Sequence, residues 1–345
     1  MFFTSYRWIR VQEHEARRSK ETGQPFFSPT LVGCAIAVAR QYFEHIGEFD
    51  EGLKVWGGEN IELAYRVWMC GGRVATITCS RVGHVFKNFP YKFDGDRERI
   101  ITKNLIRVTE AWMDGYRKYY YASAFSWDFK RAELDSEELA SLAKRIELRQ
   151  RLKCKNFEWY MHNILPEVPT PPDDAVFYGE ISNLRTKACW EPTGDYYIGM
   201  NYLCYEHKIM PQNYFYIDRF NRLKFGSKCV MARPPQPALR IMECPSDSES
   251  THRSWRWVMK TRGVIWGQLV LQLLDAQNAV TSEYCVIQVT NVYLKHLIGS
   301  QMPQLGACKD DDFQLWVWTY KFDWSQVPQR LLTSDAVGAD DHFIA

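Results

Sequence analysis

The first half of the chain carries apolar residues at the three- and four-residue intervals typical of amphipathic helices. One such helix follows residue 60, with a buried face made by Ile61, Ala64, Tyr65 and Trp68. Gly71-Gly72 then ends it, because glycine readily adopts the left-handed conformation that closes many helices. The pattern predicts further helices over residues 97–121, 136–152 and 157–164, and one helical turn over residues 42–46.

Two apolar runs, over residues 30–39 and 74–79, predict buried strands of an α/β sheet. Ligands of such sheets bind at the carboxyl ends of strands, so Trp56, Glu59 and His84 are expected around one pocket. In the helix capped by Asp135 or Ser136, an apolar stripe leaves the arginines on solvated faces. The stripe is Leu139, Leu142 and Ile146, and the arginines are Arg145, Arg149 and Arg151.

The pattern changes after the proline-rich segment 166–172, which reads as a stiff linker. Beyond it, short strands and turns repeat three times, each unit holding two cysteines followed by an aromatic strand. The pairs are Cys189 with Cys204, Cys229 with Cys244, and Cys285 with Cys308. This pattern predicts a threefold β fold with three disulfides, which an oxidising compartment permits.

Length, charge and composition argue against several classes of function. The 345 residues allow two domains, and a net charge of +2 gives no electrostatic case for nucleic acid. The longest apolar run, over residues 31–38, is far shorter than a membrane span, and the first residues do not form a signal peptide. A zinc site is disfavoured because the sequence contains no Cys-x-x-Cys pair.

A run of motifs in the first half resembles the polypeptide N-acetylgalactosaminyltransferases, Golgi enzymes that start mucin-type O-glycosylation. The motifs are WGGEN at 56–60, a helix ending in Cys-Gly-Gly, and CSRVGHVF at 79–86, with SPTLVG upstream and EAWMD downstream. The three cysteine units resemble ricin-type β-trefoil lectin repeats, which follow the catalytic domain in this family. The resemblance implies part of an α/β, Rossmann-like GT-A domain over 1–165, the linker, an all-β trefoil over 173–324 and a flexible tail over 325–345.

The activity that the resemblance implies is transfer of N-acetylgalactosamine from UDP-GalNAc to Ser or Thr of an acceptor protein or glycopeptide. It also implies retention of configuration, a Mn2+ cofactor and the Golgi lumen. Trp56 and Glu59 match the catalytic and donor-sugar positions. The other implied contacts are Gly33, Lys87 and Tyr91 for the donor, Trp8 and Phe86 for the acceptor, and His84 for the metal.

Several positions depart from the family pattern or permit a structural role. Cys34 replaces a glycine, Lys87 replaces an arginine, and the loop before Tyr91 is one residue shorter than usual. Without the resemblance, WGGEN reads as a turn with a buried Trp56 and a helix-capping carboxylate from Glu59.

The resemblance also implies a Cys70–Cys154 disulfide. The usual partner of Cys79 lies in the first half of the catalytic domain, so Cys79 is expected to be unpaired and Cys34 spare. At the sugar-contacting position of each lectin repeat stand Glu191, Met231 and Ile287, of which Glu191 alone can accept hydrogen bonds from a sugar.

The Asp-x-His motif that supplies two further metal ligands is absent upstream of His84. We therefore expect the chain to be truncated and inactive alone, with apolar strand faces left uncovered. The alternative is a non-catalytic lectin-like protein that binds carbohydrate or a partner.

Overall fold

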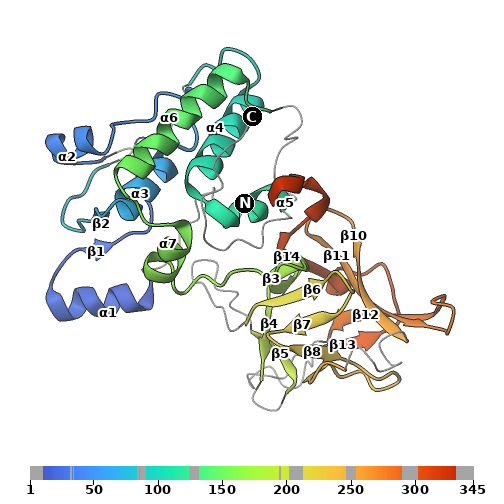
Figure 1. Ribbon diagram of the computed structural model, residues 1–345. Helices are drawn as coiled ribbons and strands as arrows, with labels where there is room; N and C mark the ends of the chain where they lie inside the picture. Colours follow the sequence, from blue (N-terminus) through green and yellow to red (C-terminus); the bar gives the residue numbers. More distant parts are fainter. Residues whose placement is uncertain are drawn as a thin grey trace. The chain divides into compact units, whose positions relative to one another are not determined.

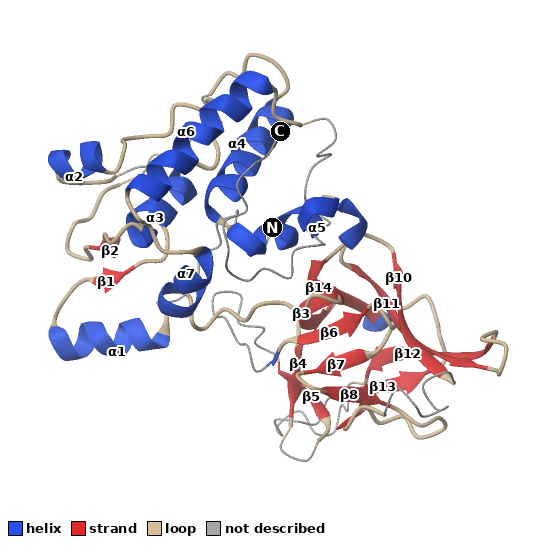
Figure 2. Cartoon of the chain, in the orientation of Figure 1, coloured by secondary structure: helices blue, strands red, loops and turns tan. Residues whose placement is uncertain are grey.

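The computed structural model describes residues 11–31, 33, 35–83, 85, 91–123, 132–193, 196–201, 213–245, 254–289 and 302–331. The chain separates into two compact units, one made of residues 1–168 and 324–345 and the other of residues 169–323. The described part of the first unit is mostly helical, and that of the second is mostly strand (Figures 1 and 2). No helix within these ranges is long and apolar enough to cross a membrane.

The first unit has a small sheet and a group of packed helices. Its helices are α1 (Glu13–Thr22), α2 (Arg40–His45), α3 (Glu59–Met69), α4 (Arg97–Trp112), α5 (Arg117–Ala122), α6 (Ser136–Arg151) and α7 (Phe157–Ile164). Strands β1 (Phe26–Phe27) and β2 (Ala75–Thr76) pair in antiparallel fashion. Helix α4 packs against α3 and α6, and α3 also packs against α7 (Figure 1).

Helix α3 is more deeply buried than its apolar pattern indicates. Every residue from Ile61 to Met69 is buried, including Glu62 and Arg66. These two side chains form a bidentate ion pair, with nitrogen–oxygen distances of 3.0 and 2.8 Å. Arg66 also donates to the carbonyl of Ile46, and the indole of Trp112 donates to Glu62. The pair therefore satisfies its hydrogen-bonding groups inside the core, as buried charges require.

The helix predicted over residues 97–121 is wrong in its middle, because the chain breaks at Asp114 between α4 and α5. Asp114 has a φ of 46° and begins a 3-10 turn, Asp114–Tyr116. Its carboxylate accepts two bonds from Arg149, at 2.8 and 2.7 Å, and one from the backbone N–H of Phe157. These tertiary bonds fix a conformation that an uninterrupted helix excludes.

The expectation that the arginines of α6 face solvent is confirmed for the exposed Arg151 and is wrong for Arg145 and Arg149. Arg145 is buried and donates to the carbonyls of Gly47 and Phe49, while Arg149 is held by Asp114. Leu139, predicted on the apolar stripe, is exposed instead. Of the two predicted capping residues, Asp135 is the one that caps α6, through a capping box with Glu138. Arginine donors thus hold loops to this helix at positions where solvated side chains were predicted.

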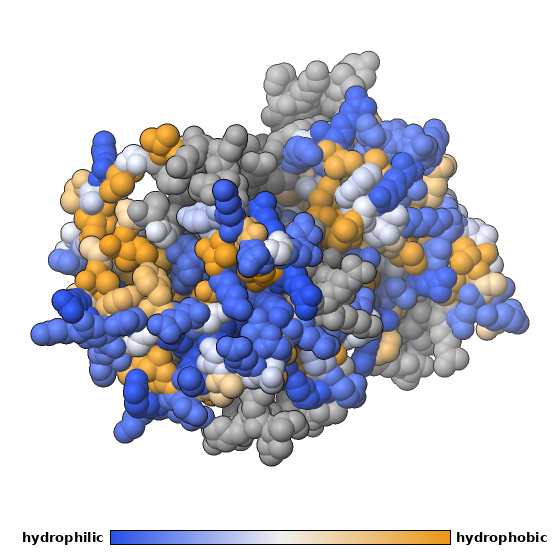
Figure 3. Space-filling view, turned by 90° about the horizontal axis from the view of Figure 1, so that it is seen from above, coloured by the Kyte–Doolittle hydropathy of each residue, from blue (hydrophilic) through white to orange (hydrophobic). Residues whose placement is uncertain are grey.

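The two predicted buried strands are largely absent. In the described part of residues 30–39 there is no strand, and the run over 74–79 forms only β2, whose residues are exposed. Among the described residues β2 pairs with the two residues of β1, which are too few to cover it. Apolar residues of these runs and just beyond them are exposed, namely Ile36, Val38, Ile77 and Val82, but they do not form the uncovered strand faces that were predicted. Apolar atoms reach the surface in several patches of the face seen in Figure 3.

The described residues of the second unit form three groups of four strands. They are β3 (Ala175–Asn183), β4 (Cys189–Pro192), β5 (Ile198–Asn201) and β6 (Phe215–Asp218); β7 (Leu223–Phe225), β8 (Lys228–Met231), β9 (Arg240–Met242) and β10 (Trp255–Thr261); and β11 (Trp266–Leu274), β12 (Val280–Gln288), β13 (Pro303–Gly306) and β14 (Leu315–Lys321).

The pairing repeats from group to group, as in a β-trefoil. In the first and third groups the first strand pairs with the second and fourth, and the second pairs with the third. The fourth strand of each group pairs with the first strand of the next, and β14 returns to β3. Between β7 and β10, where the described residues form no ladder, Trp257 donates its N–H to the carbonyl of Asn221. Six strands therefore form a closed barrel, which confirms the predicted fold class.

Tryptophans and disulfides mark the repeats of this trefoil. The indoles of Trp257 and Trp316 donate to the carbonyls of Val230 and Val286, each of which follows the first cysteine of its group. Disulfides join Cys229 to Cys244 and Cys285 to Cys308, as predicted. Cys189 is disulfide-bonded, while Cys204 lies outside the described residues.

The described cysteines of the first unit pair as the family resemblance implies. Cys70 at the end of α3 is bonded to Cys154, which follows α6. Cys79 is free and exposed among the described cysteines, and Cys34 lies outside them.

The flexible tail expected over residues 325–345 is wrong for its described beginning. Residues Trp324–Gln326 and Gln329–Leu331 form 3-10 turns of the first unit. Val327 between them is buried.

Candidate functional site

The turn over residues 54–59 holds the two central candidates, Trp56 and Glu59. Gly57 and Gly58 have φ values of 103° and 96°, which side chains rarely permit. The N–H of Gly57 donates to Oε2 of Glu59 at 2.8 Å, so the carboxylate is fixed by its own turn. Trp56 is 39% exposed, which corrects the interpretation of a buried turn tryptophan. An exposed ring beside an oriented carboxylate is suited to bind a polar ligand that has an apolar face.

The side chain of Asn104 on α4 forms hydrogen bonds with the backbone of this turn. Its Oδ1 accepts from the N–H of Lys54 at 2.9 Å, and its Nδ2 donates to the carbonyls of Lys54 and Trp56. The side chain is buried. The sequence analysis did not identify Asn104, although it interrupts the apolar face of α4 three residues after Ile101 and four before Val108. A polar residue within the apolar face of a helix is the feature of the sequence that could have identified Asn104.

Gly33 lies against the start of α3. A Cβ atom at Gly33 would come within 2.3 Å of Oδ1 of Asn60, the neighbour of Glu59. The structure therefore brings Gly33 to the Trp56–Glu59 turn, and a larger residue there would displace Asn60.

The remaining candidates are not gathered at this turn by the described residues. Trp8, His84, Phe86 and Lys87 lie outside those residues. Tyr91 is half exposed. Glu191 lies in the second unit, partly buried on β4 opposite Gly199 of β5.

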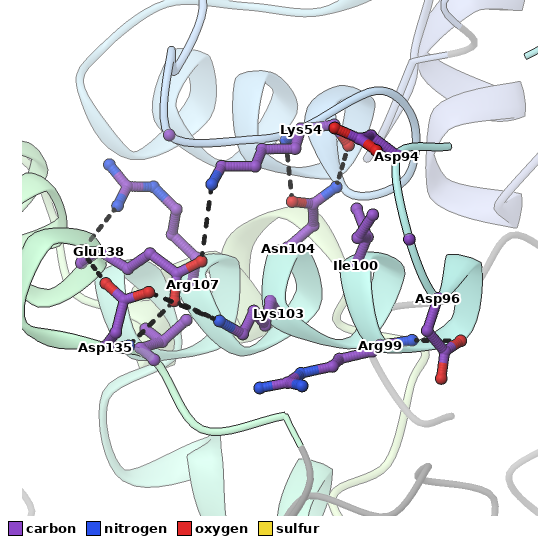
Figure 4. A pocket seen from close by; sticks show the side chains of 13 residues that line it. Lys54, Asp94, Asp96, Arg99, Ile100, Lys103, Asn104, Arg107, Asp135 and Glu138 are labelled. Carbon is purple, nitrogen blue, oxygen red and sulfur yellow. Dashed lines mark hydrogen bonds and ion pairs between the residues drawn. The ribbon is translucent and has the colours of Figure 1, made fainter. Parts of the chain in front are cut away.

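A pocket of about 340 Å³ lies on the α4 side of the turn, and Trp56 and Glu59 do not line it. Figure 4 shows its side chains. They come from the loop before α3, the segment before α4, the first three turns of α4 and the start of α6, and include Lys54, Asp94, Asp96, Arg99, Lys103, Asn104, Arg107, Asp135 and Glu138. Lys103 pairs with Glu138 at 2.6 Å. Acidic and basic groups alternate around the pocket, so no single sign of charge dominates it.

A buried ion pair supports the floor of this pocket. Arg107 donates two bonds of 2.8 Å to Asp50, and Arg145 lies 3.4 Å from the same carboxylate. Burial raises the pKa of Asp50, but the hydrogen bonds from Arg107 and the charges of both arginines outweigh it and leave the pKa lowered. The carboxylate is therefore ionised at neutral pH and serves the packing of α4 against α6.

A metal site does not assemble from the described residues, which contain no cluster of three His, Cys, Asp or Glu side chains suited to an ion. A tightly bound divalent ion needs several converging ligands. The described side chains therefore do not fit the manganese that the resemblance implies.

Replacing Asn104 by alanine is expected to lower the free energy of unfolding by about 1–3 kcal/mol, because three backbone groups of Lys54 and Trp56 lose their hydrogen bonds to the buried Asn104 side chain. Hydrogen exchange at the amide of Lys54 should accelerate accordingly. The matched control is Asn163→Ala, since the exposed Asn163 amide bonds only the carbonyl of Trp159 in its own helix among the described contacts. Equal effects of the two substitutions would contradict a specific role for Asn104.

Comparison with known proteins supports the family resemblance seen in the first unit. A family model described as the N-terminal domain of galactosyltransferase matches residues 13–88. Mouse polypeptide N-acetylgalactosaminyltransferase 6 is 40% identical over 187 residues, which are 54% of this chain and 29% of that protein. The putative polypeptide N-acetylgalactosaminyltransferase 9 of Drosophila melanogaster is 41% identical over 180 residues, 52% of this chain and 26% of that protein.

Among solved structures, GalNAc-T7 with UDP, GalNAc and Mn2+ is 23% identical, with a TM-score of 0.42 over 92% of this chain and 54% of that one. The chain spans less than a third of the length of the curated relatives described above. The resemblance to the polypeptide N-acetylgalactosaminyltransferases is therefore confirmed for about half of this chain.

Proposed function

We propose that the first unit forms part of a site that transfers N-acetylgalactosamine from UDP-GalNAc to Ser or Thr of proteins. The observation that supports this most directly is the Trp56–Glu59 turn, with two positive-φ glycines, an exposed indole and a fixed carboxylate. It lies within the residues matched by the galactosyltransferase model. The sugar and the class of acceptor in this proposal are taken from the names of the relatives described above.

In this proposal the indole of Trp56 covers the apolar face of the donor sugar, and Glu59 accepts hydrogen bonds from its hydroxyl groups. Gly33 lets the backbone approach the donor, and Lys87 and Tyr91 serve the diphosphate side. Trp8 and Phe86 contact the acceptor peptide, and His84 is a proposed metal ligand. We derive no step through manganese, because the described side chains do not assemble a metal site.

The domain assignment follows the same proposal. The first unit represents part of a GT-A domain, and the trefoil is a lectin-like domain that follows it. The disulfides support an oxidising compartment such as the Golgi lumen.

A second candidate function is carbohydrate binding by the trefoil without catalysis. Glu191 supports it, because this partly buried residue of β4 carries a carboxylate at the position where the resemblance implies a sugar contact. Met231 and Ile287 occupy the corresponding positions of the other repeats and offer no carboxylate.

Donor binding tests the first function. We expect the purified chain to bind UDP-GalNAc, as measured by saturation-transfer NMR, and Glu59→Gln to weaken that binding by roughly tenfold, the worth of one charged hydrogen bond. Glu51→Gln, at an exposed carboxylate just before the turn, is the matched control. Equal binding by both variants, or none by the parent chain, would overturn the proposed donor site.

Transfer to a Thr-rich peptide, followed in the same samples with manganese and beside His84→Ala, separates the two functions. Turnover above that of His84→Ala supports a transferase. Binding of free GalNAc that Glu191→Gln abolishes, without turnover, supports the lectin.

A further inference from the structure

A buried carboxylate on α4 depends on an arginine from the far end of the chain. The side chain of Glu110 is 3% exposed and accepts a bond from Arg117, at 2.9 Å, and another from the hydroxyl of Tyr121. Its third donor is Arg330, whose Nη2 lies 2.7 Å from Oε1. Arg117 and Tyr121 are close neighbours in sequence, whereas Arg330 follows the whole trefoil.

The segment that carries Arg330 packs on α5. The ring of Trp324 meets the ring of Tyr119 edge to face, with centroids 5.9 Å apart. Val327 is buried, and the segment is grouped with the first unit although the chain has passed through the second. Two kinds of contact, an aromatic one and a charged one, thus join residues 324–331 to α5 and α4.

The charge state of Glu110 explains why this segment docks. Burial raises the pKa of Glu110, but the bonds and charges of Arg330 and Arg117 outweigh it and leave the pKa lowered. A buried carboxylate that stays ionised requires cationic partners. Arg117 supplies one locally on Oε2, and Arg330 supplies a second on Oε1.

Helix α5 is the element that gains most from this docking. It has only six residues, and helices of that length have little stability of their own. Its last four residues are buried, which makes its order dependent on what packs around it. Arg330 is 51% exposed, so water can reach the pair and compete for it.

We propose that residues 324–331 form a clasp on the first unit, which docks on α4 and α5 through Arg330 and Trp324 and releases while the larger helices stay folded. When docked, the clasp orders α5 and brings a second cation to Glu110. When released, Arg117 remains on Glu110 and keeps α4 intact. Because α4 also carries Asn104, the clasp is anchored to the helix that holds the Trp56–Glu59 turn.

Hydrogen exchange of the full chain tests the clasp, with Arg330→Gln and Trp324→Ala as the variants. We expect exchange in α5 to accelerate by about tenfold in each, the effect of losing one charged or aromatic contact, while α3 keeps its rate. Arg17→Gln is the control, because this arginine is exposed on α1 and has no partner among the described residues. Trypsin should also cleave after Arg330 faster in Trp324→Ala than in the parent chain.

Two results would overturn the clasp. Unchanged exchange in α5 in both variants would mean that the segment packs passively. Uniform acceleration through α3 and α4 would mean that it is an inseparable part of the fold, with no released state of its own.

Discussion

Replacing Arg66 by methionine is expected to lower the free energy of unfolding of the first unit by about 3–5 kcal/mol, because it leaves Glu62 buried without its cation. Arg66 is 0% exposed and donates three bonds, two to Glu62 and one to Ile46. The indole of Trp112 then remains as the described donor to Glu62. Urea unfolding followed by the helical circular dichroism signal measures this loss, since the second unit is mostly strand.

The matched control for Arg66 is Arg40→Met. Arg40 forms an ion pair with Glu44 at the same spacing on α2, but its side chain is 89% exposed. Exposed pairs contribute only about 0–1 kcal/mol, so the midpoint should hardly move. The double variant Glu62→Gln with Arg66→Met should recover part of the loss, because it removes both buried charges. A loss for Arg66→Met no larger than the control would contradict the importance of the buried pair.

Replacing both Cys70 and Cys154 by serine is expected to cost about 4 kcal/mol, the entropy of the loop that this disulfide closes. The two residues are separated by 84 positions and join the end of α3 to the segment between α6 and α7. The N–H of Lys155 also donates to the carbonyl of Met69, so the link supports a local hydrogen bond. The helical unfolding midpoint with and without reductant provides the measurement.

Cys79→Ser is the control for the disulfide, because Cys79 is a free and exposed thiol. It should leave the midpoint unchanged. The same loss in both variants, or a midpoint of the parent chain that reductant does not shift, would contradict the stabilising role of the Cys70–Cys154 link.

Local patterns predicted the elements whose stability is local or repeated. The apolar spacing of α3 and the cap of α6 depend on neighbouring residues, so α3 was correctly located and Asp135 is one of the two residues predicted as the cap. The trefoil was predictable because three similar units each show their cysteines and aromatic strand. The motif around Trp56 and Glu59 located the candidate turn, because its two glycines are required by their positive φ angles.

Features that depend on distant partners were missed. The break at Asp114 needs Arg149, the turn needs Asn104, and neither partner is visible from spacing alone. The arginines of α6 looked solvated because polar residues usually are, yet Arg145 bonds carbonyls 96 and 98 positions away. The apolar run over 30–39 was read as a buried strand, although burial of a strand depends on what pairs with it and covers it.

The path of the chain through its two units has a consequence for synthesis. The first unit includes residues 1–168 and 324–345, so its two parts leave the ribosome with the whole trefoil between them. At about 5–20 residues per second, the delay is on the order of 10–30 s. During that interval Glu110 has Arg117 but lacks Arg330. The nascent first unit therefore lacks the contacts of residues 324–331 with α5 until translation of the trefoil is complete.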